Sequence, residues 1–312
     1  MRVGLPIHWL VILRLMLLCI GFASAGPAWA ARVAVVLSSD TPPYQEVYQV
    51  IRAMLGDASH EAVRHYADRW GGVSTDARLV ITVGTYAAEA VAGSSSRLPV
   101  LAVLVPRAWF MQTGHNLLSD GGRRQVSAIY LDQPYARQAR LIRLALPEVR
   151  RVGVLISSAE RGVLEEIDAA LRSQDLQLVH ALLNPGARLA FPLETVLADS
   201  DMLLAIPDPA VFNSATAQSL LLTSYRYRDP VMGYSRSLTR AGALFSLHSS
   251  PAQIARQSAE IVLEALRSPG LRLSSPAYPQ YFDISINEQV ARSLGFSVPP
   301  AVELERSLRG DR

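Results

Sequence analysis

Short apolar runs without polar alternation recur along this sequence, and a stretch with the apolar spacing of a helix follows most of them. The first three runs are "RVAVVLSSD" (32–40), "ARLVITVGT" (77–85) and "LPVLAVLVP" (98–106). A run that is apolar on both faces is typical of a central parallel strand with helices on both sides. The alternation of such strands with amphipathic helices predicts an α/β fold built on open parallel sheets.

The same plan starts again near residue 127. "RVGVLISS" (151–158) repeats the first strand, including its Ser-Ser ending, and further strands are expected at 176–183 and 201–208. The helix expected at 250–268 and the strand after it come too late to belong simply to the second sheet. We therefore expect two α/β halves of similar plan, with the chain crossing back between them near the end.

Residues 1–30 have the three-part pattern of a secretory signal: a basic start, an apolar stretch at 9–22 and "AWA" before Ala31. The apolar stretch is shorter than the roughly 20 residues of a membrane-spanning helix, so a cleaved signal is favoured over a membrane anchor. "ASA" (23–25) offers a second cleavage site. The pattern predicts a periplasmic protein.

The single cysteine, Cys19, lies inside this leader. A lipid-modified cysteine needs a small residue before it, and Leu18 is large, so lipidation is not expected. Without the leader the chain has no cysteine, which excludes a disulfide, a thiolate nucleophile and a cysteine-bound metal.

The charge pattern argues against nucleic acid. All 30 basic residues are arginine and are scattered along the chain, whereas a nucleic-acid surface needs a basic patch or a known module. Loss of Arg2 and Arg14 with the leader also brings the net charge close to zero.

Motifs of catalysis are missing as well. The chain has no G-x-S-x-G, no H-E-x-x-H, no phosphate-binding loop and no G-x-G-x-x-G turn. His60 and His65 are five residues apart, one more than the helical spacing of a metal pair. The sequence therefore predicts a protein that is not an enzyme and that holds no metal or cofactor.

Five stretches carry a family resemblance by their order along the chain. They are "LVITVGTYAAEAV", "RVGVLISS", "DMLLAIPDPAVFN", "DPVMGYSRSLTRAGALFSLHSSPAQIARQSAEIVLEAL" and "FDISINEQVARSLGF". Together they resemble the type I periplasmic substrate-binding proteins of ABC transporters, in the largely uncharacterised group that includes tryptophan and tyrosine binders. The resemblance implies two Rossmann-like lobes joined by three hinge strands, with a small ligand held in the cleft between them.

Under this resemblance, residues 31–126 and 247–280 form the first lobe, and residues 127–246 and 281–312 form the second. It also implies an inner-membrane ABC permease as the partner. The segment "VPRAWFMQTGHNLLSDGGRRQVSAIY" departs from the family, which usually has an Asp-Pro loop and a glycine-rich stretch there. An alternative is therefore an envelope sensor or interaction module that keeps the scaffold without transport.

Candidate ligand-binding residues follow from the strand ends. In open parallel sheets, ligands bind beyond the carboxyl ends of the strands, where helix N-termini suit a carboxylate. The residues expected there, with aromatic side chains that could stack on a ligand, are Ser38, Ser39, Asp40, Tyr44, Gly84, Thr85, Trp109, Tyr135, Ser157, Ser158, Asp208, Gly233, Tyr234 and Ser235. Hydroxyl groups for a carboxylate and one acid for an ammonium would suit an amino acid or a similar small zwitterion.

Each of these candidates has a second interpretation. The serines could be helix caps, Gly84–Thr85 a tight turn and the aromatic residues part of the core. Asp208 stands between Pro207 and Pro209, which favours extended backbone at that position. Its carboxylate could bind a ligand's positive group or the N–H groups of its own turn.

Overall fold

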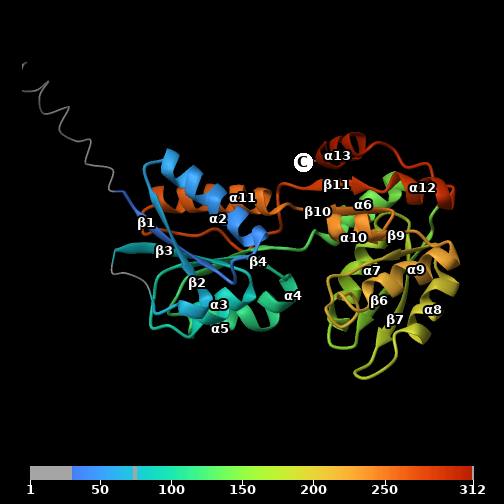
Figure 1. Cartoon of the computed structure of the whole chain (residues 1–312), viewed down its shortest axis with the longest axis horizontal. Helices are drawn as coiled ribbons and strands as arrows, with labels where there is room; N and C mark the ends of the chain where they lie inside the picture. Colours follow the sequence, from blue (N-terminus) through green and yellow to red (C-terminus); the bar gives the residue numbers. More distant parts are fainter. Residues whose placement is uncertain (1–29, 73–75, 311–312) are drawn as a thin grey trace, which may run out of the picture.

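The computed structural model describes residues 30–72 and 76–310 of the chain, and the predicted signal peptide lies almost wholly outside them. The described chain forms two mostly parallel sheets, each covered by helices on both faces (Figure 1). The α/β fold predicted from the apolar runs is confirmed. Within the described residues, none of the helices is both long and apolar enough to span a bilayer.

The first sheet has the strand order β2-β1-β3-β4-β5, with every neighbouring pair parallel. Its strands are β1 (Arg32–Leu37), β2 (Glu61–Tyr66), β3 (Ala77–Val83), β4 (Val100–Val105) and β5 (Val126–Tyr130). Helices α2 (Pro42–Asp57) and α11 (Pro251–Arg267) cover one face. On the other face lie α3 (Thr85–Ala92), α4 (Arg107–Trp109), the π-helical turn η2 (Phe110–Gly114) and α5 (His115–Ser119).

The second sheet has the order β11-β10-β9-β8-β6-β7, in which only β11 is antiparallel to its neighbour. Its strands are β6 (Arg151–Ser157), β7 (Gln177–Leu183), β8 (Met202–Leu204), β9 (Val231–Gly233), β10 (Phe245–His248) and β11 (Asp283–Ile286). One face packs against α6 (Tyr135–Ala145), α7 (Leu164–Arg172), α12 (Glu288–Leu294) and α13 (Ala301–Arg309). The other packs against α8 (Ala190–Asp199), α9 (Ala217–Tyr227) and α10 (Arg236–Ala241).

Helix α11 shows how the late segment joins the first sheet. Ser250 and Gln253 form a capping box at its start, with Pro251 at the first helical position. Ile254 and Val262 face inward and join the same core as Ile51 of α2. The chain therefore returns to the first sheet after it has built most of the second.

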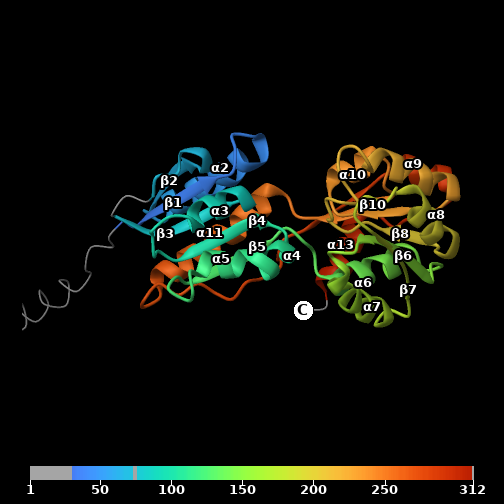
Figure 2. The same ribbon diagram turned by 90° about the horizontal axis from the view of Figure 1, so that it is seen from below.

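The chain crosses between the two sheets three times (Figure 2). The crossings follow β5, follow β10, and lie between Ala277, which pairs with Ile129 of β5, and strand β11. Ser249 links all three, because its hydroxyl donates to the carbonyl of Tyr281 at 2.6 Å and accepts from Gln133 Nε2 at 2.8 Å.

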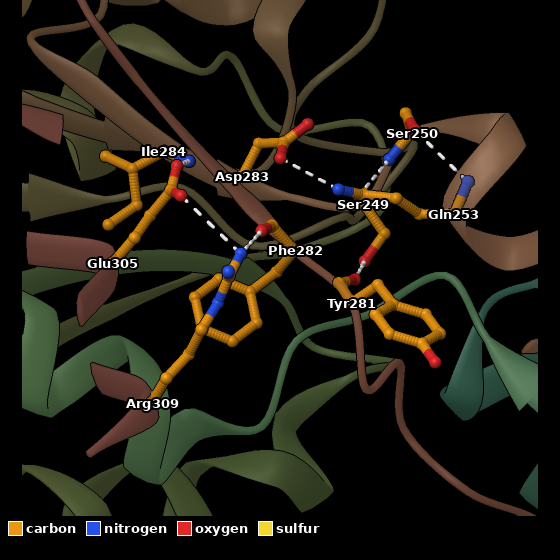
Figure 3. Close-up of polar contacts among 9 residues, drawn as sticks. All are labelled: Ser249, Ser250, Gln253, Tyr281, Phe282, Asp283, Ile284, Glu305 and Arg309. Atoms are coloured by element: carbon orange, nitrogen blue, oxygen red, sulfur yellow. Dashed lines mark hydrogen bonds and ion pairs between the residues drawn. The ribbon is translucent and has the colours of Figure 1, made fainter. Parts of the chain in front are cut away.

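Figure 3 shows the second and third crossings side by side. The side chain of Gln253 donates to Asp283 Oδ1 at 2.7 Å, and thereby ties the start of α11 to β11. Arg309 of α13 donates to the carbonyl of Phe282 at 3.1 Å from the opposite side. The crossings thus form one hydrogen-bonded hinge.

Two of the expected lobe boundaries need correction. Residues 127–130, expected to open the second lobe, are part of β5, since the apolar segment pairs with β4 of the first sheet. Residues 247–248, expected in the first lobe, end β10 of the second sheet, where they pair with β11. The division of the remaining residues between the lobes stays a prediction.

Candidate ligand-binding cleft

A cavity of about 380 Å³ lies at the carboxyl ends of the strands, where the two sheets face each other. Its lining comes from α2, from the first and second crossings, and from the loops after β8 and β9. These residues are Glu46, Leu131, Asp132, Gln133, Tyr135, Gln138, Pro207, Tyr234, Ser235, Arg236, Leu247, His248, Ser249, Ser250 and Pro251. Both halves of the protein and the hinge therefore contribute to one wall.

A second, much smaller cavity of about 20 Å³ continues the cleft on the side of α4 and of the segment before α7. Asp132, Gln133, Tyr135 and Pro207 line both cavities. The first crossing thus borders both cavities, and we call this shared wall the floor of the cleft.

Three helices begin at the wall of the main cavity. Tyr135 is the first residue of α6, Ser235 caps α10 and Ser250 caps α11. Helix N-termini carry partial positive charge, and the exposed side chain of Arg236 adds a full charge at the same rim. This part of the wall suits a carboxylate or another anion.

Asp132 supplies a negative charge to the floor of the cleft. Its Oδ2 accepts the backbone N–H of Arg107 at 2.6 Å. Burial raises the pKa of this carboxyl above its usual range, although backbone hydrogen bonds act in the opposite direction. No side chain within residues 30–72 and 76–310 donates a hydrogen bond to it.

The two tyrosines and the histidine of the cavity wall are neutral near pH 7. Burial raises the pKa of Tyr135 and of Tyr234 above that of a free phenol, so both keep their hydroxyl protons. Burial lowers the pKa of His248, whose Nε2 lies 2.8 Å from the hydroxyl of Ser285. The full charges of the wall therefore come from Glu46, Asp132 and Arg236.

An ion pair joins the two sides of the cleft at its narrow end. Arg107 of α4 lies 2.9 Å from Glu166 of α7, and both are partly exposed. Tyr278, from the third crossing, donates to the same carboxylate at 3.3 Å. We call these three residues the clasp.

Asp208 is buried, with 2% of its surface exposed, and contributes to neither cavity wall in the described structure. Its Oδ2 accepts the N–H of Ser157 at 2.7 Å, and its Oδ1 accepts the N–H of Ala210 at 2.9 Å. These contacts match the second interpretation, in which the carboxylate holds the backbone of its own turn and the end of β6. Its role in ligand binding remains an untested prediction.

Residues at the ends of β1 and β3 also have local partners. The hydroxyl of Ser38 donates to the carbonyl of Val83 at 2.8 Å and accepts the N–H of Ala87 at 3.0 Å. Gly84 has a φ of +89° and lies against Ser38, as a tight turn requires. Ser38 thus fastens the start of α3 to the sheet.

The structure brings only part of the predicted set to the main cavity. Tyr135, Tyr234 and Ser235 line it. The predicted residues outside both cavity walls are Ser38, Ser39, Asp40, Tyr44, Gly84, Thr85, Trp109, Ser157, Ser158, Asp208 and Gly233. Among these, Asp40 bonds to Tyr66 and Gln45, Ser39 lies near Thr41, and Tyr44 packs against the first core.

Several cavity residues are missing from the predicted set, above all Asp132, Gln133 and Arg236. A signal for Asp132 existed, because it follows an apolar strand and stands two residues before Pro134. The sequence pattern places the start of the second half near residue 127, whereas β5 ends the first sheet.

Comparison with known proteins places this geometry in context. A family model described as ABC transporter substrate binding protein matches residues 59–305. A conserved domain protein from Vibrio cholerae is 20% identical with a TM-score of 0.62, and the alignment covers 88% of this chain and 97% of that one. Among the curated proteins, no sequence matches.

Two further solved structures are similar over most of their length. A domain from Streptococcus pneumoniae in complex with L-Trp is 16% identical, with a TM-score of 0.60 and coverage of 88% and 97%. A ligand-free, open substrate-binding protein with adhesive properties from Clostridium difficile is 14% identical, with a TM-score of 0.65 and coverage of 86% and 96%. At such identities the likeness shows the fold, that of type I periplasmic binding proteins.

Proposed function

Because the chain belongs to the ABC transporter substrate-binding protein family, we propose that it captures a small, amino-acid-like ligand for an ABC importer. The cavity of about 380 Å³ between the two sheets carries this proposal. It is large enough for a ligand of amino-acid size, and the charges and helix N-termini of its wall suit a molecule with both an anionic and a cationic group.

Capture would proceed by closure of the two lobes around the ligand. The hinge suits such a motion, because the three short crossings can bend while the helices and sheets on either side move as rigid bodies. Closure would bring Glu46 of α2 and Arg236 of α10 together over the cavity, since both already line its rim from opposite sides. The leader predicted at residues 1–30 would direct the protein to the periplasm, where an inner-membrane permease would receive the ligand.

A thermal-shift screen against amino acids, dipeptides and nucleosides tests ligand capture. A ligand present at about 100 times its Kd stabilises the folded state by roughly 2.7 kcal/mol, which is readily measured as a rise in Tm. We expect an amino acid or a close analogue to give such a rise. If no compound in the screen shifts the Tm, the proposed function fails.

The alternative on the same scaffold is an envelope interaction module without transport. Exposed apolar side chains on α8 and α9 favour it: Phe191 is 79% exposed and Leu222 is 59% exposed. Uptake of the identified ligand by cells that lack this protein separates the two. Reduced uptake supports import, whereas normal uptake supports the interaction module.

A further inference from the structure

Basic and acidic side chains lie in different parts of the cleft. The exposed Arg236 lies at the rim of the main cavity, whereas the partly buried Asp132 lies on the floor shared by both cavities. Glu160 also lines the narrow end, where burial raises the pKa of its carboxyl. The floor is therefore acidic and the rim on the α10 side basic.

The basic side chains near Asp132 donate no hydrogen bond to its carboxylate in the described structure. The guanidinium of Arg107 is held 2.9 Å from Glu166 in the clasp. Its charge acts to lower the pKa of Asp132, but in the described part of the chain only backbone N–H groups donate hydrogen bonds to this carboxylate. His248 lines the same cavity, but burial keeps its imidazole neutral near pH 7. A partly buried carboxylate with backbone donors alone gains most from a cationic group that enters beside it.

We propose that Asp132 sets the specificity of the cleft by binding a protonated amine of the ligand, while the ligand's carboxylate points to Arg236. The proposal rests on the function proposed above and assigns the ligand to small primary amines that also carry a carboxylate. Tyr135 and Tyr234 line the space between the two charges and contact the ligand's apolar part. Neutral sugars, nucleosides and amine-free carboxylates are excluded, because none of them neutralises Asp132.

The variant Asp132→Asn tests this assignment without disturbing the fold. Asparagine keeps an oxygen that accepts the N–H of Arg107, but it removes the negative charge. Asp168→Asn is the matched control, since Asp168 pairs with Arg172 on α7 and lies outside both cavity walls. Calorimetry would use the amino acid that gives the largest thermal shift, the amine without its carboxylate, and the acid without its amine.

For Asp132→Asn we expect a loss of affinity for the amino acid of about 10- to 100-fold, the value of one charge-assisted contact, and no loss in the control. The wild-type protein should still bind the amine weakly and should not bind the amine-free acid. Asp132→Glu should recover part of the affinity, because it restores the charge.

The outcomes separate this inference from the function on which it rests. If no amino acid binds the wild type, the proposed function fails and this inference fails with it. If an amino acid binds equally well to the wild type and to Asp132→Asn, capture stands and the assignment of Asp132 is overturned. Tight binding of an amine-free ligand would also overturn it.

Discussion

Replacing Asp208 by alanine removes a buried carboxylate that holds two separate segments of backbone. Its two oxygens accept the N–H groups of Ser157 and Ala210 at 2.7 and 2.9 Å, and the residue is 2% exposed. Alanine leaves both N–H groups without an acceptor, in a site that water does not readily reach. A hydrogen bond to a charged group contributes about 1.5–3 kcal/mol, so the two together contribute roughly 3–6 kcal/mol.

This loss is a large part of the roughly 5–15 kcal/mol by which ordinary domains are stable. Urea unfolding followed by circular dichroism would measure it on the ligand-free protein. Asp201→Ala is the matched control, because Asp201 also accepts two backbone N–H groups, from Arg150 and Arg151, at a more exposed position. There water can replace the carboxylate, and we expect a loss of about 1 kcal/mol.

The reasoning would be refuted if Asp208→Ala unfolded at the same urea concentration as the wild type. A loss no larger than that of the control would have the same meaning. Either result would show that the carboxylate does not hold the turn, and would return Asp208 to the candidates for ligand binding.

Three further predictions concern other parts of the molecule. Gly84→Ala should lower the free energy of unfolding by about 2 kcal/mol, because φ is +89° and a Cβ atom would lie 2.5 Å from the hydroxyl of Ser38; an unchanged urea midpoint would contradict it. Glu166→Gln should change stability by less than about 1 kcal/mol, since its ion pair with Arg107 is partly exposed, yet should enlarge the ligand-free protein in small-angle scattering. Scattering identical to the wild type would show that the clasp does not hold the lobes together. Burial raises the pKa of Asp229 from 3.8 to about 6, so the folded state favours the protonated carboxyl. The free energy of unfolding should therefore fall as the pH rises from 4 through 6. Asp229→Asn should remove this part of the pH dependence, and a variant with the same slope as the wild type would rule out Asp229 as its source.

The sequence was sufficient for the strands because their signal is local. In β1 and β3 almost every side chain is buried, since helices cover both faces, and an uninterrupted apolar run reports this directly. The end of the first sheet was misplaced because membership of β5 depends on its pairing with β4, more than 20 residues earlier in the chain.

The site was harder to predict for the same physical reason. The position of Asp208 after a strand was read correctly, but its partner Ser157 lies 51 residues away and could not be inferred from local pattern. Tyr135, Tyr234 and Ser235 do line the cavity, because they follow strands whose ends meet at the cleft. Asp132 meets the same condition, because it follows β5, the strand that also precedes Tyr135.

The late return of α11 to the first sheet has a consequence for how the protein is made. The core beneath α2 includes Ile254 and Val262, so the face that they cover stays open until residue 267 has been synthesised. Strands β6 to β10 precede α11 in the chain, so most strands of the second sheet are made before the helix that completes the core of the first. A chain truncated before α11 would therefore expose the apolar surface that Ile254 and Val262 cover in the complete protein.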